Sequence, residues 1–163
     1  MEIAIPLVTT GIGATLVMDV ASLLRRRLFG TPIPNYALVG RWIVHSARGR
    51  IHHEAIAKSP AMRGELAIGW FTHYGVGIAF AALLALVAGA GWFERPTIAP
   101  ALATGIATVL VPFLVMQPAM GSGFAASRTP RPAAARLQSL LTHTVFGFGL
   151  YLAALLSAPL APL

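Results

Sequence analysis

The chain has 163 residues, no cysteine and a net charge of +7. Apolar residues make up 56% of it and charged residues only 10%, against about 45–50% and about 25% in soluble proteins. So little polar surface excludes an ordinary soluble domain and predicts a membrane protein. The basic residues stand between long uncharged runs, which is typical of a topology signal and excludes nucleic acid as the expected partner. Without cysteine, disulfides and thiolate metal sites are also excluded.

Uncharged apolar runs predict four membrane-spanning helices at about 3–26, 66–91, 98–120 and 137–158. Each run reaches the roughly 20 residues that a helix needs to cross a bilayer. The runs are continuous rather than alternating, so they predict helices and not the strands of a barrel. We therefore expect an all-α membrane protein, forming a single integral-membrane domain over residues 1–163, with a cytoplasmic segment at about 28–65.

The loops carry the orientation signal. Of the twelve basic residues, eight lie between the first and second spans and three between the third and fourth, whereas Arg95 alone lies between the second and third. By the positive-inside rule the eleven share the cytoplasmic side, so both termini are expected to be periplasmic.

Leu38, Val39, Trp42 and Ile43 follow a helical stripe within the cytoplasmic segment. This pattern predicts a short helix lying in the headgroup layer with Trp42 as its anchor. We expect the protein to contact anionic headgroups there, through the membrane-surface residues Arg25, Arg26, Arg27, Arg41, Trp42 and Arg48. A specific ligand role for these residues is the alternative.

Two pairs of segments suggest an internal repeat. TGIGATLV at 10–17 matches TGIATVLV at 104–111 in five of eight positions. Thr72-His73 matches Thr142-His143, and a glycine lies four residues after each histidine, at 77 and 147. This similarity predicts a tandem repeat of two helical hairpins, with His73 and His143 at similar depth and related by an approximate twofold axis.

Each predicted span contributes one strongly polar side chain, and together these residues form the candidate site: Asp19, His73, Gln117 and His143. Counted at about 1.5 Å per helical residue, they lie roughly 5–12 Å inside the cytoplasmic boundary. Asp19 is the most informative of them, because a carboxylate at membrane depth is costly and normally faces the interior of the helix bundle.

This polar layer allows several chemistries. Asp19, His73 and His143 suit a divalent cation, two histidines suit haem, and Asp19 with His73 suits proton relay. A packing-only interpretation treats the polar groups as interhelical hydrogen bonds in a structural partner subunit. Because nucleophile, zinc-protease and P-loop motifs are absent, we expect a non-enzymatic protein that binds or transports a small solute or cation. A homo-oligomer is compatible with these properties.

Glycines and prolines suggest how the helices pack. Small residues let helices approach closely, so three pairs are expected to be sites of close helix packing: Gly11 and Gly13, Gly75 and Gly77, Gly147 and Gly149. Pro112 and Pro118 are expected to kink the third span near Gln117. The glycine-rich stretch at 121–123 is expected to form a flexible turn.

The stretches GIGATLVMDV, PNYALVGRWIVH, RGELAIGWFTHYGVGIAFA, FLVMQPAMGSGFAASRTPRP and LTHTVFGFGLYL resemble those of a bacterial membrane family known as domain of unknown function 2938. The resemblance covers nearly the whole chain. It implies a small multi-spanning protein of the bacterial inner membrane, and it implies no activity, cofactor or catalytic residue.

Overall fold

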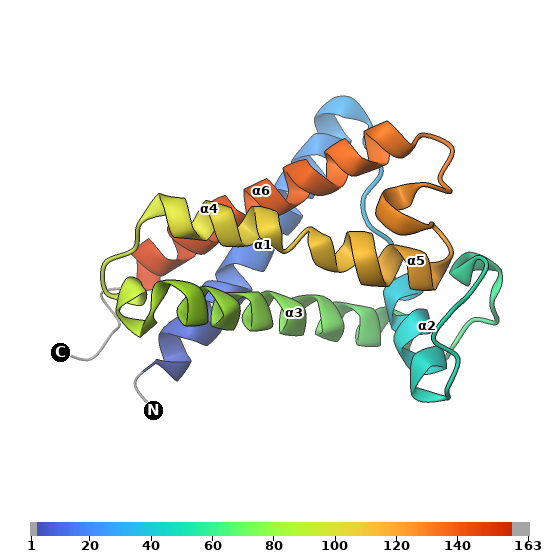
Figure 1. Ribbon diagram of the computed structural model, residues 1–163, viewed down its shortest axis with the longest axis horizontal. Coiled ribbons are helices and arrows are strands. Elements are labelled where there is room, and N and C mark those ends of the chain that lie inside the picture. Colours follow the sequence, from blue (N-terminus) through green and yellow to red (C-terminus); the bar gives the residue numbers. More distant parts are fainter. Residues whose placement is uncertain (1–2, 158–163) are drawn as a thin grey trace. The chain divides into compact units, whose positions relative to one another are not determined.

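The computed structural model describes residues 3–157, and these residues form helices and no strand (Figure 1). The elements in chain order are α1 (Ala4–Phe29), α2 (Tyr36–Ala47), η1 (Ile56–Lys58), α3 (Glu65–Ala88), η2 (Ala90–Phe93), α4 (Ile98–Ala107), η3 (Pro112–Met116), α5 (Gln117–Met120), η4 (Phe124–Ala126) and α6 (Pro132–Ser157). The predicted all-α class is therefore confirmed.

Four segments are long and apolar enough to cross a membrane: Ala4–Phe29, Glu65–Ala88, Ile98–Met120 and Pro132–Ser157. They coincide with the four predicted spans, although the last begins five residues before the predicted 137. The two chain ends, which are expected to be periplasmic, lie outside the described residues, as does position 158 of the fourth predicted span.

The chain divides into two compact units. The first unit holds the segment up to Ile33, Tyr74–Thr108 and the segment from Leu141 onward, while the second holds Pro34–His73 and Val109–Leu140. Helices α3 and α6 contribute residues to both units. The single domain over 1–163 and the tandem repeat stay predictions.

Small residues bring the helices of the first unit together. A Cβ on Gly11 of α1 would lie 2.6 Å from Ile78 Cα of α3, and a Cβ on Gly147 of α6 would lie 2.9 Å from the Ala101 carbonyl of α4. Figure 1 shows α4 and α6 side by side. Gly13 and Gly149 are similarly crowded, but a Cβ on Gly75 would meet nothing within 4 Å. The prediction of close helix packing at Gly75 was therefore wrong.

The core of the first unit closes around these contacts. Phe146, Leu84 and Leu150 are among its fully buried side chains, and Trp92 and Phe93 after α3 join the same cluster. The large apolar side chains that remain exposed on α1 and α3 suit helices that face lipid.

The third span is interrupted as its prolines predicted. Its α-helix α4 ends at Ala107, η3 is a π-helical turn, and α5 follows directly. Figure 1 shows the ribbon losing its regular coil between α4 and α5. Pro112 and Pro118 have no N–H to donate, so they cannot continue the α-helical hydrogen-bond ladder. Gln117 directly follows the π-helical turn.

Helix α2 confirms the predicted short helix and packs against the start of α3 within the second unit. Asn35 caps it by accepting a 3.1 Å hydrogen bond from the Ala37 N–H. A Cβ on Gly40 would overlap the Glu65 carbonyl, and a Cβ on Gly69 would overlap the Tyr36 carbonyl. The backbones of α2 and α3 are therefore in direct contact. The placement of α2 in the headgroup layer stays a prediction.

The segment after α2 contacts the end of the third span. The His53 N–H donates a 2.8 Å hydrogen bond to the Ala119 carbonyl, and a Cβ on Gly121 would overlap the Glu54 carbonyl. Gly121 has φ 96°, which favours glycine. The predicted flexible turn is thus a packed helix end at this residue.

Candidate functional site

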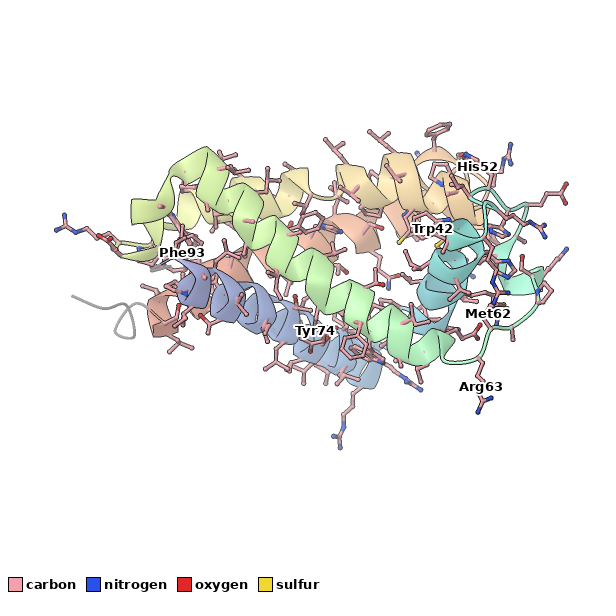
Figure 2. The ribbon with its side chains drawn as sticks, turned by 90° about the horizontal axis from the view of Figure 1, so that it is seen from below. Trp42, His52, Met62, Arg63, Tyr74 and Phe93 are labelled. Atoms are coloured by element: carbon pink, nitrogen blue, oxygen red, sulfur yellow. The ribbon has the colours of Figure 1, made fainter. Side chains whose placement is uncertain are left out.

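Asp19 lies in α1 and contacts a tyrosine of α3. The Tyr74 hydroxyl donates a 3.1 Å hydrogen bond to Asp19 Oδ2, and Figure 2 shows Tyr74 on α3 beside α1. Both residues belong to the first unit. Asp19 is partly buried, and its hydrogen-bond partner lies on another helix. This is expected for a carboxylate in a membrane span.

His73 contacts a different helix although it precedes Tyr74. Its Nε2 lies 2.9 Å from the Tyr36 hydroxyl of α2, and the two rings stack with centroids 4.2 Å apart. Trp70 packs on the same tyrosine at 4.5 Å. Successive residues of a helix point about 100° apart, which explains why His73 reaches α2 while Tyr74 reaches α1.

The hydrogen bonds of His143 in α6 determine its tautomer. The Thr108 hydroxyl donates to the Gly105 carbonyl at 2.6 Å and lies 2.9 Å from His143 Nδ1. A hydroxyl has only one proton. Because that proton is directed at the carbonyl, Nδ1–H of the imidazole must donate to Thr108. In the neutral ring Nε2 then carries a lone pair, and it has no hydrogen-bond partner among residues 3–157.

Gln117 differs from the other three. Its Oε1 is buried and has no hydrogen-bond partner in the described part of the chain. A buried acceptor without a donor costs about 1–3 kcal/mol. In native structures such groups mark strain, a functional role or a bound water or ion.

The four candidate residues divide between the units: Asp19 and His143 belong to the first, His73 and Gln117 to the second. Their common depth stays a prediction. Three of them have hydroxyl partners that the sequence reasoning missed, namely Tyr36, Tyr74 and Thr108. The hydroxyls of Tyr74 and Thr108 lie in the predicted spans and were the available signal. Within residues 3–157, no three His, Cys, Asp or Glu side chains form a group that could hold a metal ion.

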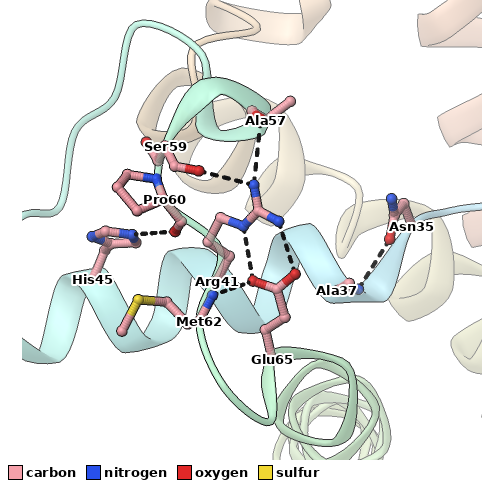
Figure 3. Close-up of polar contacts among 9 residues, drawn as sticks. All are labelled: Asn35, Ala37, Arg41, His45, Ala57, Ser59, Pro60, Met62 and Glu65. Atoms are coloured by element: carbon pink, nitrogen blue, oxygen red, sulfur yellow. Dashed lines mark hydrogen bonds and ion pairs between the residues drawn. The ribbon is translucent and has the colours of Figure 1, made fainter.

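Arg41 forms the ion pair of the second unit. Its Nε and Nη2 each donate a 2.8 Å hydrogen bond to the Glu65 carboxylate, and its Nη1 donates to the carbonyls of Ala57 and Ser59 (Figure 3). Glu65 also accepts from the Met62 N–H at 2.8 Å. The predicted membrane-surface residue Arg41 therefore holds α2, the turn at η1 and the start of α3 together.

The other predicted membrane-surface residues are of two kinds. Arg26, Arg27 and Arg48 are exposed. Trp42 is partly buried and donates from Nε1 to the Ile51 carbonyl at 2.9 Å. Arg25 is partly buried as well, and its guanidinium is bound to α6 through Thr142.

A comparison with protein families decides where the chain belongs. The model of the family described as protein of unknown function, DUF2938, matches residues 8–157. The chain is a member of this family. The match includes the first span from residue 8 onward, the other three spans and every candidate residue, in agreement with the resemblance seen in the sequence. No curated protein and no solved structure matches the chain.

Proposed function

We propose that this DUF2938 protein is a non-enzymatic protein of the bacterial inner membrane that binds or transports a small solute or cation. The observation that carries the proposal is the buried Oε1 of Gln117, which has no hydrogen-bond donor among residues 3–157 and follows a π-helical turn in a membrane span. π-Helical turns occur frequently at functional sites. A solute that donates hydrogen bonds, or a cation, would supply what the amide oxygen lacks.

The chemistry of the other candidate groups favours the same ligand class. His143 presents the lone pair of Nε2, and Asp19 is an acceptor when ionised. Acceptors and a negative charge favour a cation or an N–H or O–H donor. A bare divalent metal has less support, because the described residues group no three suitable ligands.

The proposal includes an orientation. Eleven of the twelve basic residues lie in the two segments assigned to the cytoplasm or in the span ends next to them, which supports periplasmic termini and a site near the cytoplasmic side. A C-terminal fusion to alkaline phosphatase, which is active only in the periplasm, should be active. An active cytoplasmic reporter at the same position would reverse the orientation.

Transport is tested in proteoliposomes with methylammonium and potassium as probes. Wild-type protein should carry at least one of them, and Gln117→Leu and Asp19→Asn should each lower the flux by about tenfold, the loss expected for one charged or buried hydrogen bond. Tyr151→Phe is the control, because the Tyr151 hydroxyl has no hydrogen bond among residues 3–157. Folded wild-type protein that neither binds nor carries either probe would contradict the proposal.

A second candidate function, that of a structural subunit in a membrane complex, is favoured by the hydroxyl partners of Asp19, His73 and His143. Interhelical hydrogen bonds of this kind hold helices together. Asp19→Asn would then lower stability and leave binding unchanged. The haem alternative has less support, because Nε2 of His73 faces Tyr36; a Soret band in purified protein would restore it.

A further inference from the structure

Arg25 is held by two hydroxyls near the end of α1. Its Nη2 donates to Ser22 Oγ at 3.3 Å and to Thr142 Oγ1 at 2.9 Å. Ser22 is buried, at 8% exposure, and lies one turn before Arg25, while Thr142 belongs to α6. All three residues are in the first unit. The guanidinium is therefore fixed in one orientation by contacts from two helices.

This arginine has no carboxylate partner. Within residues 3–157 the ion pair of an arginine is that of Arg41 with Glu65, and no Asp or Glu oxygen lies within 4.0 Å of Arg25. Its Nε is buried and has no hydrogen-bond partner in the described part of the chain. Removing a guanidinium from water without a counter-charge is costly. Two neutral hydroxyls orient the cation but do not neutralise it.

We infer that Arg25, with Ser22 and Thr142, binds an oxyanion of the phosphate class. A guanidinium is permanently charged, and each terminal nitrogen carries two N–H groups that can donate to phosphate oxygens. Since Nη2 is used by the two hydroxyls, the ligand would bind at Nη1, which has no hydrogen-bond partner among residues 3–157 and is not among the buried nitrogens. Ser22 Oγ accepts from Arg25, so its own proton remains available to the same anion.

Two sources could supply this phosphate group. Arg25 lies four residues before the end of α1 at Phe29, which corresponds to about 6 Å of helix. In a spanning helix this is close to the depth of lipid headgroups, and the exposed Arg26 and Arg27 add positive charge there. An anionic lipid and a free phosphate ion offer the same chemistry, and the experiment separates them.

The test measures ligand binding by native mass spectrometry on full-length protein in a neutral detergent at constant ionic strength. The probes are phosphatidylglycerol, diacylglycerol as a lipid without phosphate, and inorganic phosphate. Arg25→Gln is compared with Arg26→Gln, which removes the same charge from the exposed neighbouring residue. Arg25→Gln should weaken phosphate-group binding by about tenfold or more, and Arg26→Gln by much less.

The pattern of losses identifies the source or overturns the inference. If Arg25→Gln selectively loses binding of phosphatidylglycerol, the ligand is a lipid headgroup. If it selectively loses binding of inorganic phosphate, the ligand is a soluble phosphate. Equal losses of binding in Arg25→Gln and Arg26→Gln would show an effect of general surface charge and would overturn the site. A wild-type protein that binds neither phosphatidylglycerol nor inorganic phosphate, or that prefers diacylglycerol, would also overturn it.

Two milder variants keep the test decisive if Arg25→Gln does not fold. Arg25→Lys retains the charge but replaces the fixed, planar guanidinium by a flexible ammonium group, and Ser22→Ala removes one hydroxyl. Each should weaken binding by a smaller factor than Arg25→Gln, and unchanged affinity in both would contradict the inference. Because neither Gln117 nor Asp19 is altered, failure here leaves the proposed cation or solute site standing.

Discussion

Arg41 of the second unit and Arg25 of the first are both fixed by hydrogen bonds from two segments of the chain, but they differ in charge balance. Arg41 makes two 2.8 Å bonds to the Glu65 carboxylate. Among residues 3–157, Arg25 is bonded only to the hydroxyls of Ser22 and Thr142. A cation that the chain itself neutralises is part of the architecture. A cation that is oriented but not neutralised is prepared for a ligand.

The same distinction applies to the candidate polar residues. Asp19, His73 and His143 have a hydroxyl partner on another helix or at a helix end, and Gln117 Oε1 has none in the described chain. Variants that remove single contacts distinguish architectural contacts from contacts left for a ligand.

Gly40→Ala should separate α2 from α3 and thereby remove the frame of the Arg41 pair. The added methyl group would overlap the Glu65 carbonyl, and overpacking of this kind costs about 1–3 kcal/mol and occasionally more. Thermal unfolding in detergent measures the loss. Gly75→Ala is the matched control, since its Cβ would meet nothing within 4 Å. Equal destabilisation by both variants would show that the α2–α3 contact is unimportant.

Glu65→Gln should leave Arg41, like Arg25, without a carboxylate partner. The guanidinium keeps its bonds to Ala57 and Ser59 but loses its counter-charge. We expect a lower melting temperature, and we expect it to recover partly in Arg41→Gln/Glu65→Gln, because the double variant leaves no unpaired charge. A double variant that loses the full sum of the two single losses would mean that the residues act independently.

Tyr74→Phe should have a moderate effect. It removes the donor to Asp19 Oδ2, and hydrogen bonds between membrane helices are worth about 0.6 kcal/mol on average and up to about 1.7. Unfolding free energy in mixed micelles is the measurement. Tyr151→Phe serves as the control, because its hydroxyl makes no hydrogen bond within residues 3–157. Indistinguishable losses would argue that the Asp19 contact contributes nothing.

The smallest expected effect is a pH dependence at His53. Burial lowers its pKa below the ordinary value, and the nearby Arg50 and His45 charges act in the same direction. The folded state thus disfavours the protonated ring. Its stability contribution is complete above the unfolded pKa of about 6.5 and is lost as pH falls through the lower folded pKa.

Hydrogen exchange of the His53 amide, which donates to Ala119, should report this loss. After correction for intrinsic rates, protection should fall on acidification in the wild type and remain constant in His53→Gln. Protection that is independent of pH in the wild type would contradict the assigned direction.

The sequence predicted the spans and the interruption of the third one, because run length and proline are local properties. Partners across helices depend on angular position and tilt, which the sequence alone does not fix. His73 and Tyr74 illustrate this, since adjacent residues contact α2 and α1 respectively. Thr142 was noted only as part of the repeated Thr-His pair, yet it binds Arg25. Glu65 was not recognised as the partner of Arg41.

The π-helical turn at Pro112–Met116 also makes the third span sensitive to chain length. Such a turn accommodates one residue more than an α-helix does, so it behaves as a one-residue insertion retained in the chain. Deleting a single residue from it would restore an α-helical register and rotate everything beyond it, beginning with Gln117, by about 100°. Insertions and deletions here would therefore alter the direction of the Gln117 amide without replacing that residue.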